Sequence, residues 1–363
     1  MTERRIGVGI VGAGFILDQY IQTLRAAPDV EVRHLASMHP ERARARADEF
    51  GLPSAGSYAD LLRDDSVDVV VNLTVPQVHA ELTAQALDAG KHVWSEKPLA
   101  LSIKDGRELL DLATARGLRL GCAPDTFLGS GLQTALRLIR SGRIGTPRSA
   151  FANFQYPGPN VWHPNPEFLF QAGGGPLLDM GPYYLTALVQ VFGPIVRVSA
   201  EATTATPTRI IAKGPRAGER FTVEVPTHVS ALYTFACGGV ATVILSFDTP
   251  IRRVALEVAG TDGALALPDP NHFTGGSELF RPDGGREPIT PTPPGGAGRG
   301  TGIVDLVRSI RAGEPHRTDA RLAFHVLEAM LATEEAARDG RAVDIASDVE
   351  PASLLSHDWK LDR

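Results

Sequence analysis

Hydrophobic and polar positions follow a strand–turn–helix pattern at the start of the chain. The apolar run Ile6–Val11 is typical of a buried parallel strand. The glycine turn Gly12-Ala13-Gly14 comes next, and apolar residues then recur at helical spacing over residues 16–27, as far as Pro28. This order predicts the first half of a dinucleotide-binding unit.

The glycine turn has the chemistry of a pyrophosphate site. Gly12 permits the tight turn, and Gly14 lets the backbone approach a pyrophosphate at the N-terminus of the following helix. Leu17 stands where the usual fingerprint has its third small residue, which can widen the contact between helix and strand. The alternative is an ordinary strand-to-helix turn.

The pattern over residues 1–124 alternates strands with helices. The run at residues 67–73 is almost continuously apolar, so it predicts a central strand of a covered parallel sheet. Thr74 and Pro76 follow at its carboxyl end, where open α/β sheets bind ligands, and His79 is a candidate cofactor contact or a packing histidine. Further strands are predicted at residues 30–36, 91–95 and 118–122, and helices at residues 40–50, 78–89 and 102–117.

The end of the second predicted strand carries information on the cofactor. Ser37 stands where an NAD-binding fold usually has an acidic residue for the ribose 2′-hydroxyl. A carboxylate there would repel a 2′-phosphate, whereas Ser37 can donate to one, and His39 and Arg42 can add positive charge. The pattern favours NADP over NAD. The alternative is that Ser37 is a neutral loop residue and Arg42 belongs to a solvated helix face.

From about Asp125 the pattern changes to alternating and β-branched runs with few long helices between them. It predicts a largely antiparallel sheet with one open face. Residues 268–302 are rich in Pro and Gly and predict a mobile loop. The fold class is therefore an α/β Rossmann domain at residues 1–124, followed by an α+β substrate-binding and oligomerisation domain at residues 125–363. Strands are expected at residues 148–156, 196–204, 221–225, 229–235, 240–247 and 254–259, and helices at residues 127–141, 303–311 and 320–338.

Composition excludes several classes of partner. The 363 residues include 36 Lys and Arg against 42 Asp and Glu, giving a net charge of −6 and no basic block, so nucleic acid and anionic membranes are not expected partners. Two cysteines make no disulfide framework, and no zinc-type spacing or other metal cluster is present. The N-terminus lacks the pattern of a signal peptide, which predicts a cytoplasmic protein.

Three further motifs carry a family resemblance. They are P-x-x-H at residues 76–79, A-G-K-H-V at residues 89–93 and E-K-P at residues 96–98. Together they resemble the Gfo/Idh/MocA oxidoreductases, a family of NAD(P)-dependent sugar and cyclitol dehydrogenases and their relatives. The resemblance implies that Lys97 lies between nicotinamide and substrate, with a cis peptide at its bond to Pro98, and that the open sheet face makes a homodimer or homotetramer.

Another motif, at residues 173–184, supplies the other candidate catalytic groups. Asp179 and Tyr183 are spaced by one helical turn, so they lie on one face of a helix that Pro182 is expected to kink. The family usually has D-x-x-x-H here. The D-x-x-x-Y of this chain resembles the glucose–fructose oxidoreductase and dimeric dihydrodiol dehydrogenase branch, which tends to use NADP. The alternative for Tyr183 and Tyr184 is aromatic core packing.

Moving a hydride requires a proton to join or leave the substrate oxygen. A phenol titrates near ~10, too high for a base at neutral pH, and a neighbouring ammonium lowers that value. We therefore expect Lys97 to assist Tyr183 or to relay the proton itself, with Asp179 orienting Lys97 within the cleft between the domains. Cofactor contacts are expected from Gly12, Gly14, Phe15, Ile16, Ser37, His39, Arg42, Thr74, Pro76, His79, Glu96 and Lys97. Substrate contacts are expected from Trp162, His163, Asn165, Tyr184 and His272.

The sequence thus predicts an NADP-dependent oxidoreductase acting at a carbinol or carbonyl carbon of a sugar or related polyhydroxylated compound. An NAD-linked cyclitol or 3-keto-glycoside enzyme of the same family is the nearest alternative. A non-catalytic dinucleotide-binding redox sensor, in which Tyr183 is purely structural, is a third.

Overall fold

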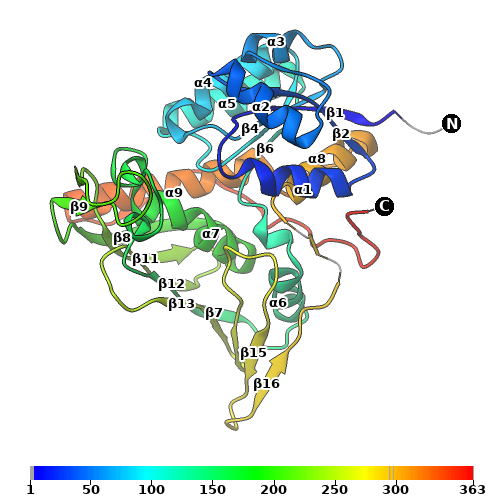
Figure 1. Cartoon of the computed structure of the whole chain (residues 1–363). Coiled ribbons are helices and arrows are strands. Elements are labelled where there is room, and N and C mark those ends of the chain that lie inside the picture. Colours follow the sequence, from blue (N-terminus) through cyan, green and yellow to red (C-terminus); the bar gives the residue numbers. More distant parts are fainter. Residues whose placement is uncertain (1–3, 294, 297, 363) are drawn as a thin grey trace. The chain divides into compact units, whose positions relative to one another are not determined.

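The chain folds into two compact units in a computed structural model that describes residues 4–293, 295–296 and 298–362 (Figure 1). The first unit comprises the described residues of Met1–Ser130, Pro293–Phe324 and Ala352–Arg363. The second comprises Gly131–Thr292 and His325–Pro351. Two returning segments of the C-terminal half therefore belong with the first unit, whereas the division predicted from the sequence places the whole C-terminal half in one domain.

The first unit contains a six-stranded parallel sheet in the order β3-β2-β1-β4-β5-β6. This is the strand order of a Rossmann fold, as the sequence predicts. The strands are β1 Ile6–Val11, β2 Val30–Ala36, β3 Ala55–Gly56, β4 Val69–Asn72, β5 His92–Ser95 and β6 Leu120–Cys122. The helices are α1 Leu17–Ala26, α2 Pro40–Phe50, α3 Tyr58–Arg63, η1 Pro76–Val78, α4 His79–Asp88, α5 Ile103–Arg116, η2 Thr126–Leu128 and α8 Thr301–Ala312.

Several of these helices begin and end where their capping residues predict. Ser57 and Asp60 form a capping box at the start of α3, and Ser102 caps α5. Gly51 and Gly117 end α2 and α5 in the left-handed conformation that glycine adopts without strain.

The returning segment α8 completes the core on one face of the parallel sheet. Ile303, Val304, Leu306 and Val307 are buried with residues of β1, β4 and α1. On the other face, side chains of α4 and α5 pack with Phe324. The amphipathic pattern of α8 predicts a buried stripe, but it does not say which sheet the stripe covers, and this explains the difference from the predicted domain division.

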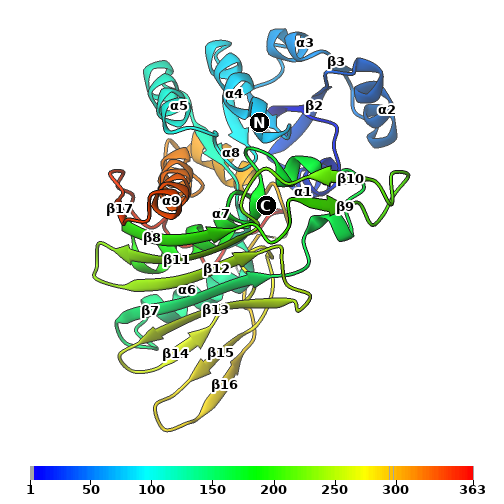
Figure 2. The same ribbon diagram turned by 90° about the vertical axis from the view of Figure 1, so that its left-hand side faces the viewer.

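The second unit contains a nine-stranded sheet in the order β16-β15-β14-β13-β7-β12-β11-β8-β17 (Figure 2). All its neighbouring strands are antiparallel except β7 and β12, so the predicted mainly antiparallel sheet is confirmed. The strands are β7 Pro147–Gln155, β8 Ile195–Thr203, β11 His228–Phe235, β12 Val240–Ser246, β13 Arg253–Gly260, β14 Ala264–Ala266, β15 Ser277–Phe280, β16 Arg286–Ile289 and β17 Val343–Asp344. The remaining elements are α6 Ser130–Arg140, η3 Pro159–Val161, η4 Glu167–Phe170, α7 Gly175–Phe192, the hairpin β9 Thr208–Ile210 and β10 Arg220–Thr222, and α9 Ala320–Asp339, which begins in the first unit.

One face of this sheet is covered by α7, which packs on β7, β11 and β12. Pro182 lies inside α7, and the helix is nevertheless assigned without interruption from Gly175 to Phe192. The loop predicted over residues 268–302 is wrong in part, because β15 and β16 form a hairpin that extends the sheet. These two short strands could not be predicted from the sequence, because the surrounding Pro and Gly residues are typical of a loop.

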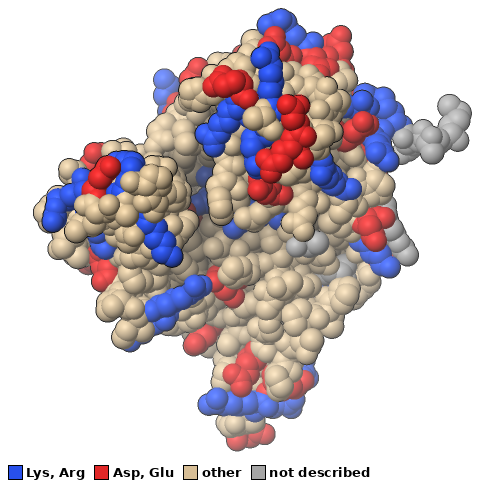
Figure 3. Space-filling model, viewed as in Figure 1, with Lys and Arg blue, Asp and Glu red and all other residues tan. Residues whose placement is uncertain are grey.

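Charges of both signs are interspersed over the face of the molecule drawn in Figure 3. No extended patch of a single sign is visible on that face, in keeping with the absence of basic blocks in the sequence. None of the helices in the described parts of the chain has the length and apolarity needed to cross a membrane.

Candidate functional site

In the glycine turn after β1, Gly12 is needed for the backbone conformation and Gly14 borders open space. Gly12 has a φ of 114°, and a Cβ atom there would lie 2.6 Å from the carbonyl oxygen of Leu73. A Cβ atom on Gly14 would meet nothing within 4 Å. Gly12 is therefore required by the fold, whereas the space beside Gly14 is available to a ligand.

The helix that follows this turn offers its N-terminus to an anion. No side chain caps α1, whose N-cap residue is Ile16, and Phe15 is 86 % exposed beside it. Leu17, which replaces the third small residue of the fingerprint, is fully buried in the core rather than displaced towards the ligand. These features fit the pyrophosphate of a dinucleotide.

Ser37, His39 and Arg42 lie together after β2. The Ser37 hydroxyl oxygen accepts a hydrogen bond from the backbone N–H of His39 at 3.2 Å. The His39 ring lies 3.7 Å from Glu41, and both side chains are largely exposed. Arg42 is exposed in the first turn of α2, and the structure shows no ion pair for it among the described residues. The group therefore presents one hydroxyl and up to two cations, and no carboxylate occupies position 37.

The loop after β4 is organised by Asn72, which the sequence analysis did not single out. Its amide oxygen accepts from the Thr74 backbone N–H at 3.2 Å and from the Thr74 hydroxyl at 2.5 Å. His79 is 1 % exposed, and its ring nitrogens lie 2.8 Å from the Pro98 carbonyl and 3.1 Å from the Thr74 carbonyl. The sequence signal for Asn72 was a polar residue at the end of an otherwise apolar strand. His79 joins the Thr74 and Pro98 loops and, being buried, presents no ring surface to a ligand.

The E-K-P segment follows β5, and its Lys97–Pro98 bond is cis, as the resemblance implies. Glu96 is 9 % exposed. One of its carboxylate oxygens accepts from the Tyr20 hydroxyl at 2.6 Å, and the other accepts from the Lys97 backbone N–H at 3.1 Å. Burial holds the pKa of Tyr20 well above its usual range, so the phenol keeps the proton that it donates. Glu96 thus ties the Lys97 loop to α1.

Asp125 is a second buried carboxylate of the first unit that sequence reasoning missed as a functional group. One oxygen accepts hydrogen bonds from the backbone N–H groups of Gly300 and Gly302, both at 2.9 Å, where α8 begins. Burial raises the pKa of Asp125 to about 6, and these backbone bonds act against the rise. The carboxyl group anchors the returning segment close to the chain that leaves β6.

This raised pKa predicts a pH dependence of stability. Because the folded state holds the Asp125 proton more tightly than the unfolded chain, the contribution of Asp125 to stability is fully present below pH 4 and is lost as pH rises through about 6. The unfolding free energy of the wild type relative to Asp125→Asn should fall by about 3 kcal/mol between pH 3.5 and 7. Urea unfolding of both proteins across this range tests it, and a constant difference would contradict it.

In the second unit, α7 carries Asp179 and Tyr183 one turn apart. Asp179 is partly exposed and Tyr183 is 5 % exposed. Burial raises the pKa of Tyr156, at the end of β7, and the charge of Asp179 adds to this rise. Burial lowers the pKa of His163, and the negative charge of Asp179 acts against that fall. Tyr156, Trp162, His163 and Asp179 therefore lie near one another, and we call this group the aromatic wall.

The aromatic wall is built on a loop that follows β7. Trp162 is 48 % exposed and packs edge-on against His163, with their ring centroids 5.4 Å apart. The backbone N–H of Asn165 donates to the His163 ring at 3.0 Å, and its amide oxygen lies 3.4 Å from Arg216. The loop thus presents an indole face, an imidazole and an amide at the surface.

Two other predicted substrate contacts lie apart from this loop. Tyr184 is fully buried, 6.2 Å from the ring of Phe154, so in this structure its side chain has no surface that a substrate can touch. His272 is 61 % exposed and lies 3.6 Å from Asp269. Tyr156 was missed in the sequence, where its place at the end of a strand beside the Pro157-Gly158 turn was the only signal.

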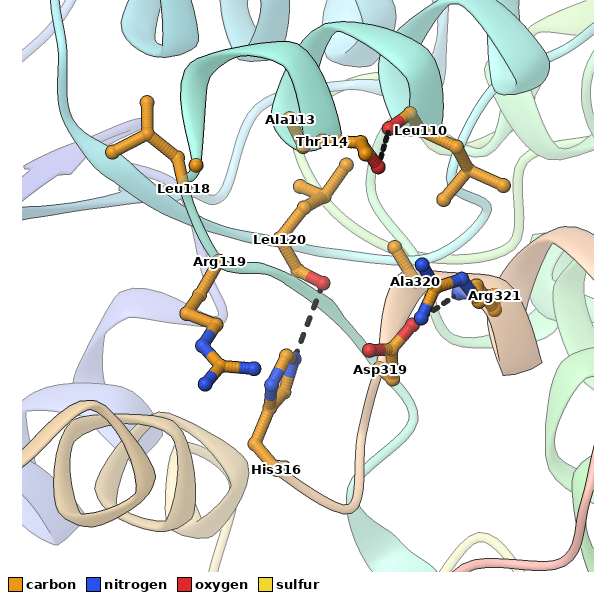
Figure 4. Close-up of a pocket in the computed structure, with 11 residues that line it drawn as sticks. Leu110, Ala113, Thr114, Leu118, Arg119, Leu120, His316, Asp319, Ala320 and Arg321 are labelled. Carbon is orange, nitrogen blue, oxygen red and sulfur yellow. Dashed lines mark hydrogen bonds between the residues drawn. The ribbon is translucent and has the colours of Figure 1, made fainter. Parts of the chain in front are cut away.

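A separate hollow of about 320 Å³ lies in the first unit at the start of β6 (Figure 4). His316 bonds to the Leu120 carbonyl there, and Asp319 accepts from the backbone N–H of Arg321. None of the predicted site residues lines it. The hollow is at the start of a strand, whereas ligands of open α/β sheets bind at the carboxyl ends, so it is not the candidate active site. Within the described residues, no group of His, Cys, Asp or Glu side chains is placed to hold a metal ion.

These features define a dinucleotide-binding oxidoreductase fold, and comparisons with known proteins agree. Residues 6–123 match the family described as "Oxidoreductase family, NAD-binding Rossmann fold". Residues 132–266 match "GFO/IDH/MocA C-terminal domain". The chain therefore belongs to the Gfo/Idh/MocA oxidoreductase family and has an NAD(P)-binding Rossmann domain.

Two curated relatives share 31 % identity with the chain. The dTDP-3,4-didehydro-2,6-dideoxy-alpha-D-glucose 3-reductase of Streptomyces violaceoruber matches over 80 % of this chain and 82 % of its own. The D-xylose 1-dehydrogenase (NADP(+)) 2 of Haloferax volcanii matches over 93 % and 99 %. Among solved structures, an NAD binding oxidoreductase from Klebsiella pneumoniae is 25 % identical, covers 95 % of this chain and all of its own, and has a TM-score of 0.81.

Proposed function

We propose that this protein is an NADP-dependent oxidoreductase acting on a carbinol or carbonyl carbon of a sugar or a related polyhydroxylated compound. The observation that carries the proposal is the first unit's pair of loops: a glycine turn with open space beside Gly14, and an E-K-P loop that Glu96 ties to the same helix α1. The relatives at 31 % identity support it, since both are named for redox reactions of sugars.

The proposed cofactor, when bound, supplies or takes up the hydride. Gly14 and the start of α1 would hold its pyrophosphate. In the oxidising direction Tyr183, as phenolate, accepts the proton of the substrate hydroxyl, and Lys97 stabilises that phenolate or relays the proton. We expect Asp179 to orient the Lys97 ammonium and to balance its charge. Glu96 and His79 position the loops that carry Lys97, because both are buried and engaged.

The second unit supplies the substrate contacts in this proposal. Trp162 offers a ring face on which the C–H face of a sugar stacks, and His163, Asn165 and His272 exchange hydrogen bonds with hydroxyl groups. Tyr184 is buried and packs near Phe154, whose ring also contacts Tyr156 of the aromatic wall. Exposed apolar side chains on the open sheet face, among them Phe151 at 37 % and Leu232 at 48 %, support assembly into a homodimer or homotetramer, which light scattering would detect.

The preference for NADP rests on Ser37, His39 and Arg42. Arg42 is an exposed cation at the start of α2, and the Ser37 hydroxyl lies on the same short loop. A 2′-phosphate would bring negative charge to these cationic side chains. The 2′-hydroxyl of an NAD ribose would find no carboxylate at position 37 to accept its hydrogen bond.

Substitutions in this loop should change the cofactor preference. Arg42→Ala is expected to weaken NADPH binding by about tenfold and to leave NADH binding unchanged, because a hydrogen-bonded charge contact contributes about 1.5–3 kcal/mol. Ser37→Asp should lower NADPH affinity further and raise NADH affinity. Fluorescence titration with both cofactors measures the change, and Arg44→Ala, on the same helix, serves as the matched control. Equal effects on both cofactors would contradict a 2′-phosphate site.

The activity itself is tested by following reduced nicotinamide while the protein is offered NADP⁺ with a panel of aldoses and polyols, and NADPH with ketoses and keto-sugars. Turnover of at least one class is expected. Cofactor binding without turnover across the whole panel would instead favour a redox sensor.

A further inference from the structure

Arg252 is the residue directly before β13 of the nine-stranded sheet. β13 pairs with β7 so that Arg253 is opposite Gln155 and Val254 is opposite Phe154. Phe154 contacts the Tyr184 ring of α7, so this row of side chains faces α7. Because successive side chains of a strand alternate between faces, Arg253, the first residue of β13, points to the open side. Arg252 comes directly before it, level with Tyr156, which follows Gln155 in the chain.

The electrostatic neighbours of Arg252 agree with this position beside Tyr156. Burial raises the pKa of Tyr156 and of Tyr184, and the positive charge of Arg252 acts against the rise in both. The guanidinium therefore lies within electrostatic reach of both hydroxyl groups. Tyr156 belongs to the aromatic wall, so Arg252 stands at its edge, close to the groups proposed to hold the substrate.

The charge of Arg252 is available to a ligand. The side chain is exposed, and among the described residues no carboxylate forms an ion pair with it. Two nearby arginines of this unit are instead paired with carboxylates: Arg209 with Asp248, and Arg216 with Glu167 and Glu219. The negative charge of Asp269 adds to the raised pKa of Tyr184. Asp269 itself accepts a hydrogen bond from the Asn271 backbone and lies beside His272.

We infer that Arg252 binds an oxyanion carried by the substrate, which makes the substrate an acidic sugar. Its planar guanidinium matches the paired oxygens of a carboxylate or a phosphate, whereas the wall's other polar groups suit hydroxyls. A sugar acid or a sugar phosphate would place its anionic group on Arg252 and its hydroxyls on the aromatic wall. This inference rests on the proposed function and adds the substrate class to it.

The test compares matched pairs of substrates in the full-length protein with NADP⁺. Glucose is compared with glucuronate and with glucose 6-phosphate, so the two arms separate a carboxylate from a phosphate. In the wild type, kcat/KM should be at least about tenfold higher for one acidic member than for glucose. Arg252→Gln should remove that advantage mainly by raising KM for the acidic sugar, and Arg252→Lys should retain part of it.

Arg253→Gln is the matched control, since it removes the adjacent arginine, which lies on the open sheet face, and should leave turnover of all three substrates unchanged. NADPH titration verifies that each variant is folded. Turnover of glucose alone, or an equal loss for neutral and acidic sugars in Arg252→Gln, would overturn the role of Arg252 and leave the proposed function standing. No turnover of these three sugars, nor of any member of the panel of aldoses, polyols, ketoses and keto-sugars, would contradict the proposed function itself.

Discussion

Replacing Lys97 by Met should lower kcat by a factor of about 10² to 10⁴, the usual contribution of a positioned proton-transfer group, and leave NADPH binding close to that of the wild type. The Lys97 backbone N–H is held by Glu96, so the loop keeps its anchor when the side chain changes. Methionine matches the length of the lysine stem and removes only the ammonium group. Single-turnover measurements with a substrate identified in the sugar panel give the rate of the chemical step.

Tyr183→Phe should show a loss of similar size, because the phenol and the ammonium are proposed to act in one proton transfer. The double variant should be little slower than either single variant, since groups that act as a unit give non-additive losses. Lys104→Met, at an exposed position on α5, is the control and should be silent. Near-normal rates in both Lys97→Met and Tyr183→Phe would end the assignment of these residues as catalytic.

The second large effect is expected at the glycine turn. Gly14→Ala should weaken binding of NADPH by about 10- to 100-fold, because its methyl group would enter the space that a pyrophosphate needs. The apo protein should keep its Tm, since that methyl group would meet nothing within 4 Å. Isothermal calorimetry and thermal unfolding of the same preparation separate the two effects.

Gly12→Ala supplies the contrast. A methyl group there would lie 2.6 Å from the Leu73 carbonyl oxygen on a backbone with positive φ, so both Tm and NADPH affinity should fall. If Gly14→Ala bound NADPH as tightly as the wild type, the pyrophosphate could not lie against this turn.

Local sequence signals predicted the elements that carry the candidate site. The turn at Gly12 and Gly14 needs a tight backbone at a strand end, and E-K-P follows a short strand, so short-range chemistry places both. Helix ends such as Gly51 and Ser57 were predictable for the same reason, because capping acts over a few residues.

Long-range partnerships were not predictable in this way. Tyr20 and Glu96 meet across 76 positions of sequence, and Asp125 accepts from Gly302 across 177. An amphipathic stripe shows that α8 is buried, but it does not name the sheet that α8 covers. The same limit hid the β15–β16 hairpin, whose pairing depends on the neighbouring strand β14 rather than on its own Pro- and Gly-rich surroundings.

Parallel fluorescence titration of the purified protein with NADPH and NADH tests the central claim most directly, after mass spectrometry of a denatured sample has shown whether cofactor co-purifies. We expect both to bind, with NADPH at least about tenfold tighter because one charge-assisted contact to the 2′-phosphate contributes about 1.5–3 kcal/mol. A preference for NADH would make Ser37 a plain loop residue and bring cyclitols and keto-glycosides forward as substrates. Binding of neither cofactor would contradict the dinucleotide site on which the proposed reaction depends.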